Sequence, residues 1–169
     1  MKTLRCFLLT LILLGAPALT GWAAATDGTA WLEFTTLSEG WAHSPNHVLA
    51  VWITDARTNF ITTVLKHGNN RAQHLSTWNA ARRGNADVDG VSGATLTSHG
   101  VITAAWNCRN RKGTTVPDGT YLFFAEFTEG DFQGPRAVFS FVKGPQAQST
   151  QLARQGNFKA IKVSFVPEK

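Results

Sequence analysis

The residues most able to do chemistry stand together at positions 89–98, which read DGVSGATLTS. Thr95 offers a hydroxyl directly after a glycine and an alanine, whose minimal side chains let the active site of another enzyme close around the backbone. Asp89 and Ser92 can hold a turn by bonding their own backbone. The segment therefore presents a hydroxyl for modification. The alternative is an ordinary turn after which Thr95 begins a strand.

This segment resembles the flavin-attachment signature of extracytoplasmic bacterial electron-transfer proteins. The signature is Asp, two unspecified residues, Ser or Thr, Gly, Ala, and then Thr or Ser, and here its places are filled by Asp89, Ser92, Gly93, Ala94 and Thr95. The resemblance is strongest to flavin-bearing subunits of the sodium-pumping NADH:quinone reductase and related Rnf complexes. It implies that Thr95 carries FMN through a phosphoester, delivered by a flavin transferase. His99 is a candidate contact for the flavin, and a surface histidine is the alternative.

The first 25 residues are typical of a secretory signal peptide. Lys2 and Arg5 supply the positive end, residues 7–14 an apolar run, and residues 23–25 a small-residue cleavage site. The run is too short to span a membrane, and no later segment approaches the roughly twenty apolar residues of a transmembrane helix. We therefore expect a soluble periplasmic protein whose mature chain, residues 26–169, forms one domain.

Charge and cysteine content restrict the partners and the source of stability. Removal of two basic residues with the signal peptide lowers the formal charge from +5 to +3. With export, this modest charge argues against a nucleic-acid partner, and the basic clusters at 82–83 and 109–112 are expected to be solvated loops. Cys108 is the one cysteine of the mature sequence, so the fold must depend on its hydrophobic core rather than on disulfides.

The mature sequence alternates short apolar runs, rich in β-branched and aromatic residues, with turn residues, which predicts an all-β domain. The expected strands are 31–36, 47–54, 60–66, 101–106, 120–127, 137–143 and 160–166. Residues 55–59 are expected to form a hairpin turn, and residues 144–156 a long polar connection. Between 68 and 90 the three-residue spacing of Ala72, Leu75 and Trp78 predicts a short helix within a long crossover.

About seven strands at this spacing indicate an immunoglobulin-like β-sandwich. The order Trp106, Gly113 and then residues 116–121, VPDGTY, resembles the Ig-like domain of the flagellar hook-capping protein. Tyr121 would then bond back to the chain as in a tyrosine corner. Residues 47–166 together resemble a bacterial family of predicted periplasmic proteins of unknown function with an Ig-like body. That resemblance implies fold and compartment rather than activity.

The remaining histidines and hydroxyls give little support for an enzyme or a metal site. His43 and His47 have a spacing that suits a metal on a helix, but Pro45 argues against that helix. With no cysteine pair or acidic cluster beside them, we expect loop histidines and no metal. Ser98 and His99 are adjacent, so in an extended chain they point to opposite sides and form no nucleophile-base pair.

Two classes of function remain open. The first is a redox carrier that holds FMN on Thr95 and passes electrons between membrane-associated and soluble redox proteins. The second is a non-catalytic binding or assembly module without cofactor, including a sugar-binding sandwich. Trp52 and Trp106 are expected in the core. Trp41 and Trp78 are expected in loop or crossover regions, where they could stack on a sugar or an isoalloxazine ring.

Overall fold

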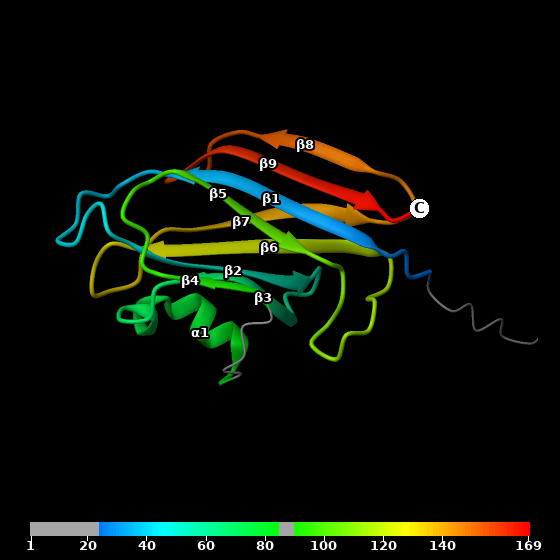
Figure 1. Cartoon of the computed structure of the whole chain (residues 1–169), viewed down its shortest axis with the longest axis horizontal. Coiled ribbons are helices and arrows are strands. Elements are labelled where there is room, and N and C mark those ends of the chain that lie inside the picture. The colour runs from blue at the N-terminus through cyan, green and yellow to red at the C-terminus, as the bar shows by residue number, and fades with distance from the viewer. Residues whose placement is uncertain (1–23, 85–89) are drawn as a thin grey trace, which may run out of the picture.

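The computed structural model describes residues 24–84 and 90–169 of the chain. Most of the expected signal peptide and Asp89 lie outside the described residues. Within them, two β-sheets pack face to face, and a short helix lies on the outer side of one sheet (Figure 1). The elements are β1 Gly28–Thr36, β2 Val48–Asp55, β3 Phe60–His67, η1 Ala72–His74, α1 Ser76–Arg82, β4 Val91–Gly93, β5 Val101–Trp106, β6 Gly119–Thr128, β7 Arg136–Lys143, β8 Gln148–Leu152 and β9 Phe158–Pro167.

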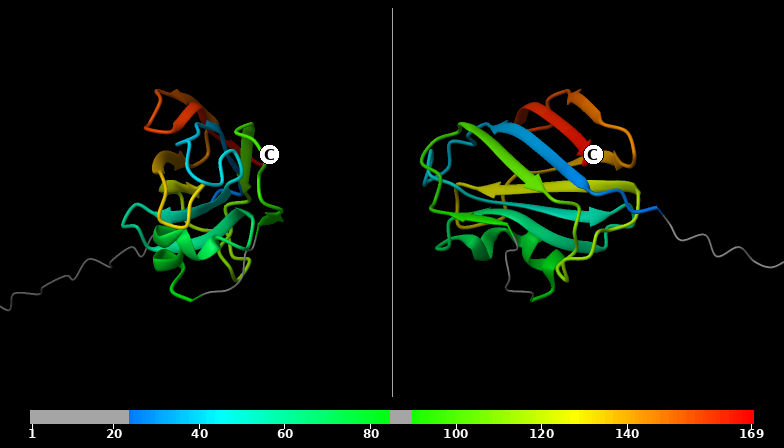
Figure 2. Two further views of the ribbon diagram at one scale, coloured as in Figure 1. Left: turned by 90° about the vertical axis from the view of Figure 1, so that its left-hand side faces the viewer. Right: turned by 45° about the vertical axis from the view of Figure 1, so that its right-hand side comes forward.

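The two sheets have the strand orders β5-β1-β9-β8 and β4-β3-β2-β6-β7. Neighbouring strands are antiparallel except β3 and β4, which run parallel. Side views show the sheets as separate layers with α1 beyond the five-stranded one (Figure 2). The expectation of an all-β sandwich with a long, partly helical crossover is confirmed.

The core lies between the sheets, where alternate residues of each strand point inward. Phe34 of β1 contacts Phe139 and Phe158, with ring centroids 6.3 and 5.5 Å apart. Each fully buried ring contributes about 1.5–3 kcal/mol of hydrophobic stabilisation. Because Cys108 is buried, the pKa of its thiol rises to about 11, which leaves it unreactive at neutral pH.

Strand β2 is buried on both faces, as its continuous apolar run predicts. Leu49, Val51 and Ile53 face the sandwich core. On the other face, Val48, Ala50 and Trp52 pack with Leu75 and Trp78 from the crossover. The crossover therefore supplies a second, smaller core beneath α1.

Two short strands were not expected from the sequence. Residues 144–156 are not simply a polar connection, because β8 pairs with β9 from Gln148 to Leu152. Strand β8 reads QSTQL and is largely exposed, so it lacks the apolar alternation by which the other strands are recognised. Strand β4 is only three residues long and is held by parallel pairing with β3. Both are edge strands stabilised chiefly by backbone hydrogen bonds.

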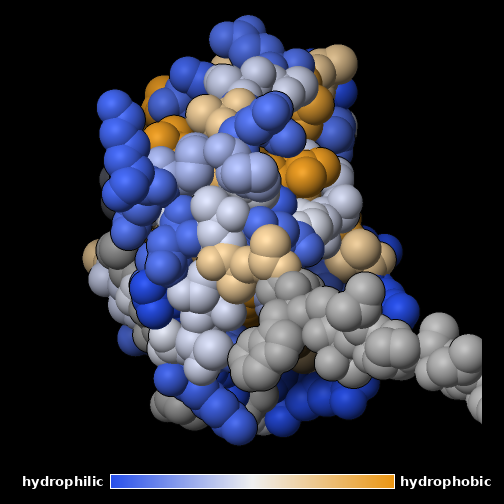
Figure 3. Space-filling view, turned by 90° about the vertical axis from the view of Figure 1, so that its right-hand side faces the viewer, coloured by the Kyte–Doolittle hydropathy of each residue, from blue (hydrophilic) through white to orange (hydrophobic). Residues whose placement is uncertain are grey.

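Tyr121 and Trp106 fix the end of the sandwich where β6 begins. The Tyr121 hydroxyl donates a hydrogen bond of 2.6 Å to the carbonyl of Pro117, four residues upstream, as expected. Its ring lies 5.2 Å from that of Trp106, which is buried as predicted. Seen from this end, hydrophobic residues form small patches separated by hydrophilic ones (Figure 3), an ordinary protein surface.

Candidate functional site

The flavin-signature segment enters the fold through β4. Ser92 and Gly93 lie beside Lys66 and His67 of β3, and the Gly68 N–H donates a 2.9 Å hydrogen bond to the Gly93 carbonyl. The side chains at positions 92–94 are exposed. The residues that precede the candidate acceptor are therefore attached to the sheet by their backbone and open to another protein on their outer side.

Two glycines allow this close approach. A Cβ added to Gly90 would lie 1.8 Å from the carbonyl oxygen of Val64, and one added to Gly93 would lie 2.4 Å from Nδ1 of His67. The first contact is with backbone, which cannot rotate away. The signature specifies Gly93 but leaves the position of Gly90 open, so the requirement at Gly90 comes from the pairing of β4 with β3.

Thr95 is half-buried rather than fully exposed, and its hydroxyl is uncommitted. Among the described residues, its side chain makes no hydrogen bond. A Cβ on Gly68 would lie 2.9 Å from Thr95 Oγ1 and 2.5 Å from Val48 Cγ1. Gly68 also has a φ of +78°, which disfavours other residues. A glycine at this position leaves space beside the hydroxyl.

The backbone is anchored on both sides of Thr95. On one side, the His67 ring donates from Nδ1 to the carbonyl of Ala94, at 3.1 Å. On the other, Leu96 and His47 exchange two backbone hydrogen bonds of 2.9 and 3.0 Å. Thr95 is thus the one residue between two fixed points, so the position of its hydroxyl is set by the fold.

His99 is not a surface histidine, and its side chain is only 13 % exposed. Its Nε2 donates to Oε1 of Glu129 at 2.6 Å, because a carboxylate only accepts. Its Nδ1 lies 2.8 Å from the hydroxyl oxygen of Thr36. The ring also stacks on that of His47, with centroids 4.3 Å apart and planes at 6°. Both ring nitrogens are occupied, so His99 ties the end of the segment to Thr36 of β1 and to Glu129, which directly follows β6.

Glu129 is the centre of this cluster, and its side chain is fully buried. Besides His99, it accepts hydrogen bonds from the Glu39 backbone N–H at 2.7 Å and the Ser38 hydroxyl at 3.1 Å. Burial acts to raise the pKa of Glu129, but these hydrogen bonds together hold it below its ordinary value. Glu129 therefore remains a carboxylate and joins the loop after β1 to the segment after Thr95.

His47 is fully buried, so the expectation that it is a loop histidine is wrong. Its Nδ1 donates to the carbonyl of Pro45 at 3.0 Å, and its Nε2 has no hydrogen-bond partner among the described residues. Burial lowers the pKa of His47, and proximity to His99 lowers it further. The imidazole is therefore neutral at neutral pH, and a proton on Nε2 would have no acceptor.

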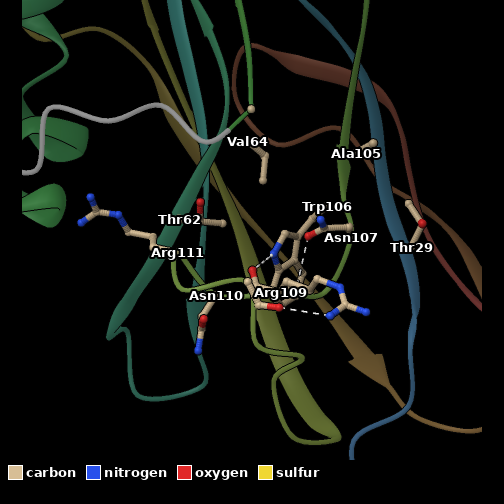
Figure 4. Close-up of a pocket in the computed structure, with 11 residues that line it drawn as sticks. Thr29, Thr62, Val64, Ala105, Trp106, Asn107, Arg109, Asn110 and Arg111 are labelled. Carbon is tan, nitrogen blue, oxygen red and sulfur yellow. Dashed lines mark hydrogen bonds between the residues drawn. The ribbon is translucent and has the colours of Figure 1, made fainter.

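A cleft of about 360 Å³ borders the beginning of the segment at Gly90 (Figure 4). It opens between β3, which contributes Thr62 and Val64, and the end of β5. There the Trp106 indole N–H donates to the Arg109 carbonyl at 2.8 Å. The Arg109 guanidinium is already paired with Asp27 at 2.8 Å. Most polar groups of this cleft are thus engaged within the protein.

Both tryptophans expected in loop or crossover regions pack against other side chains of the protein. Trp78 lies in the crossover as expected, but it is 3 % exposed and donates its indole N–H to Thr63 at 2.9 Å, so it is not accessible for stacking on a ligand. Its ring is also covered by the guanidinium of Arg82, 4.5 Å from the ring centroid. Trp41 packs on Phe132, with centroids 4.4 Å apart. Sequence reasoning missed that both rings have internal partners.

No group of three or more His, Cys, Asp or Glu side chains is arranged to hold a metal ion in residues 24–84 and 90–169. Over the same ranges, no helix is both long and apolar enough to cross a membrane.

Comparison with known proteins identifies one family. The model of the family described as "Predicted periplasmic protein (DUF2271)" matches residues 30–157. This range contains Ser92 to His99 as well as Glu129. No curated protein and no solved structure matches the chain.

Proposed function

The chain belongs to the DUF2271 family of predicted periplasmic proteins, and from this premise we propose that it is a periplasmic electron-transfer protein that carries FMN covalently on Thr95. The mature protein comprises residues 26–169 after removal of the signal peptide. One observation carries the proposal: the last residue of the signature has an uncommitted hydroxyl held between two anchored neighbours. The residues before it are exposed.

Thr95 and its neighbours are suited to hold a covalently attached FMN. A phosphoester needs a hydroxyl that the fold does not use elsewhere, and Thr95 makes no side-chain hydrogen bond within the described chain. By contrast, the hydroxyls of Thr36 and Thr128 are bonded to His99 and to nearby carbonyls. A transferase needs room around the backbone, and Gly93 and Ala94 provide it. Gly68 leaves space beside the oxygen.

The attachment step is a phosphoryl transfer from FAD. The Thr95 hydroxyl oxygen forms a bond to the phosphorus of the FMN half, and the pyrophosphate bond breaks. AMP leaves, and a base of the transferase takes the hydroxyl proton. Such transfers depend on positioning and charge neutralisation. This chain contributes the positioning, because the backbone at Ala94 and Leu96 is fixed.

Once attached, FMN supplies reversible electron transfer with unidentified periplasmic or membrane redox proteins. The role of His99 in the proposal is to position the segment through Glu129 and Thr36, since both of its ring nitrogens are occupied. Asp89 and Ser92 are proposed to shape the turn recognised by the transferase. Ser92 is exposed and available for that contact.

Coexpression with a periplasmic flavin transferase tests the proposal. We expect a yellow protein whose flavin fluorescence survives denaturing electrophoresis, with a matching increase in intact mass. Thr95→Ala should abolish the label and leave the fold intact, because a hydroxyl without a partner contributes little to stability. Thr97→Ala is the matched control, since Thr97 is exposed two residues further on and should not affect labelling. Asp89→Ala should slow labelling.

A colourless wild-type protein, in cells whose transferase labels a control substrate, would overturn the redox proposal. The non-catalytic binding or assembly module would then take its place. Labelling of Thr95→Ala would instead show that another residue accepts the flavin.

A further inference from the structure

The helix α1 lies on the outer face of the five-stranded sheet (Figure 1), and a groove opens between the two, lined by residues of β2, β3, β6 and α1. We propose that this groove, which we call the helix groove, binds a planar aromatic molecule that carries a carboxylate, sulfonate or phosphate. Its volume is about 780 Å³, within the range of small-molecule sites. The inference is independent of flavin attachment at Thr95.

The floor of the helix groove is aromatic. Trp52 of β2 and Phe124 of β6 stack with centroids 5.2 Å apart and planes at 19°. Phe60, at the start of β3, pairs across the sheet with Thr54 and lines the same groove. Three adjacent strands thus contribute one ring each. Because Phe60 and Phe124 are only half-buried, part of this aromatic surface is accessible.

The helix leaves this floor uncovered at one end. Ala80 and Ala81 are the α1 residues that line the groove together with Thr77. Their small side chains do not reach over the rings. Arg82, the next residue, packs over Trp78 instead of lining the groove. The helix groove is therefore open because α1 has alanines at positions 80 and 81. Larger side chains at these positions would fill the space above the rings.

The rim is positively charged. Arg57 and Arg83 line the groove and are exposed, and none of the described residues that line it is acidic. Within the described chain, neither guanidinium makes a hydrogen bond or a salt bridge. The acid near Arg57 is Asp55, whose carboxylate already accepts hydrogen bonds from the backbone N–H groups of Arg57 and Asn59. Two cations above an aromatic floor complement an anion with a flat apolar body.

Three neutral polar side chains of the groove, those of Thr54, Asn59 and Thr77, are committed to hydrogen bonds within the protein. Thr54 donates its hydroxyl to the carbonyl of Asp55 at 2.9 Å. Thr77 accepts hydrogen bonds from the side chains of Gln133 and Arg136, at 2.7 and 3.1 Å. Asn59 donates its side-chain amide to Asp55 at 2.8 Å. A neutral sugar would find few free partners, so aromatic contact and charge determine the class of ligand.

The rim also contains two residues with positive φ, Thr58 at +65° and Arg83 at +47°. Such a conformation is uncommon for a β-branched residue and is disfavoured for any L side chain. Strained backbone of this kind is often found at ligand clamps. Here it fixes the two turns from which the arginines project.

The test uses the mature Thr95→Ala protein, so that covalent flavin cannot contribute. Two probe pairs share a ring system and differ in charge: FMN with riboflavin, and 2-naphthoate with 2-naphthol. Titration by calorimetry and tryptophan fluorescence should show at least about tenfold tighter binding of the anion in at least one pair. The double variant Arg57→Gln/Arg83→Gln should abolish that preference.

Two further variants separate ring contact from charge and from unfolding. Phe60→Ala should weaken both members of the pair, whereas Arg154→Gln, an exposed arginine outside the groove, should change neither. Circular dichroism of each variant checks that it folds. Equal affinity for the anion and its neutral partner in both pairs, or an anion preference that survives the double arginine variant, would overturn the proposal.

Discussion

Two buried glutamates, Glu126 in β6 and Glu129 directly after it, each anchor part of the chain between β3 and β5. Glu126 holds the start of α1 by accepting hydrogen bonds from the backbone N–H groups of Thr77 and Trp78, at 3.2 and 2.8 Å. Glu129 holds His99, two residues before β5. Both carboxylates are inaccessible to solvent, so the difference between them depends on their partners.

The partners give the two carboxylates opposite pKa shifts. Burial dominates at Glu126 and raises its pKa, although hydrogen bonds from Trp78 and Thr77 oppose the shift. At Glu129, hydrogen bonds that include His99 outweigh burial and lower the pKa. The fold thus favours the charged form of Glu129 but disfavours that of Glu126. Of the two anchors, Glu129, which holds His99, is the one that the fold stabilises in its charged form.

The largest expected effect is at Glu129. Glu129→Gln replaces one acceptor oxygen by an amide nitrogen that cannot accept, so either His99 or both Ser38 and Glu39 lose their acceptor. We expect the free energy of unfolding at pH 7 to fall by about 3 kcal/mol, measured by urea denaturation. A loss below about 1 kcal/mol would show that the carboxylate is not a charge-dependent anchor.

The same anchor has a defined pH dependence. Because the folded-state pKa of Glu129 lies below the ordinary value of 4.5, its contribution to stability is complete above that pH and is lost as the pH falls through the folded-state value. The Glu129→Gln protein should lack this component of acid destabilisation. Denaturation curves of both proteins below pH 4.5 would measure it.

His47 adds a second pH dependence of stability to this region, at a higher pH than that of Glu129. Its folded-state pKa is lowered from 6.5, so below that pH the unfolded chain binds a proton that the folded chain does not. Stability should therefore fall as the pH decreases below 6.5, with a slope of at most about 1.4 kcal/mol per pH unit from this residue. His47→Gln should reduce the slope between pH 6.5 and 5. An unchanged slope would contradict a buried neutral imidazole.

The strands and the helix could be predicted because their signals are local. The apolar run of β2 and the three-residue spacing of Ala72, Leu75 and Trp78 indicate their structures within a few residues. Strand β8 could not be predicted, because its polar sequence is set by pairing with β9 rather than by burial. The signature was enough to name Thr95 as a candidate attachment residue. It did not predict the hydrogen bonds that fix the backbone on either side of Thr95.

The hydrogen bonds of Glu126 and Glu129 join residues that are far apart in the sequence, which explains why the sequence did not predict them. Glu126 and Trp78 are 48 residues apart, and Glu129 and His99 are 30 apart. One local signal was available: Glu126 stands in the otherwise apolar run 121–127, YLFFAEF. A charged residue in a buried strand requires a partner. The sequence does not show that the partner of Glu126 is the start of α1. The residue at the N-cap of α1, Leu75, makes no side-chain capping hydrogen bond, so the sequence has no capping residue that would mark this helix end.

The smallest effect is expected at Glu126, and it would complete the comparison. Glutamine resembles the protonated carboxyl that the folded state favours, and its remaining carbonyl oxygen can still accept from Trp78, the shorter of the two backbone hydrogen bonds. Glu126→Gln should therefore lower the free energy of unfolding at pH 7 by less than about 1 kcal/mol.

The pH profile of Glu126 should also have the opposite sign to that of Glu129. Because the folded-state pKa of Glu126 lies above 4.5, its contribution is greatest below that pH and declines as the pH rises through the folded-state value. The difference in unfolding free energy between wild type and Glu126→Gln, measured upward from pH 4.5, should follow this decline. If Glu126→Gln instead destabilises the protein as much as Glu129→Gln does, the charged carboxylate is required at the start of α1, and the two anchors work in the same way.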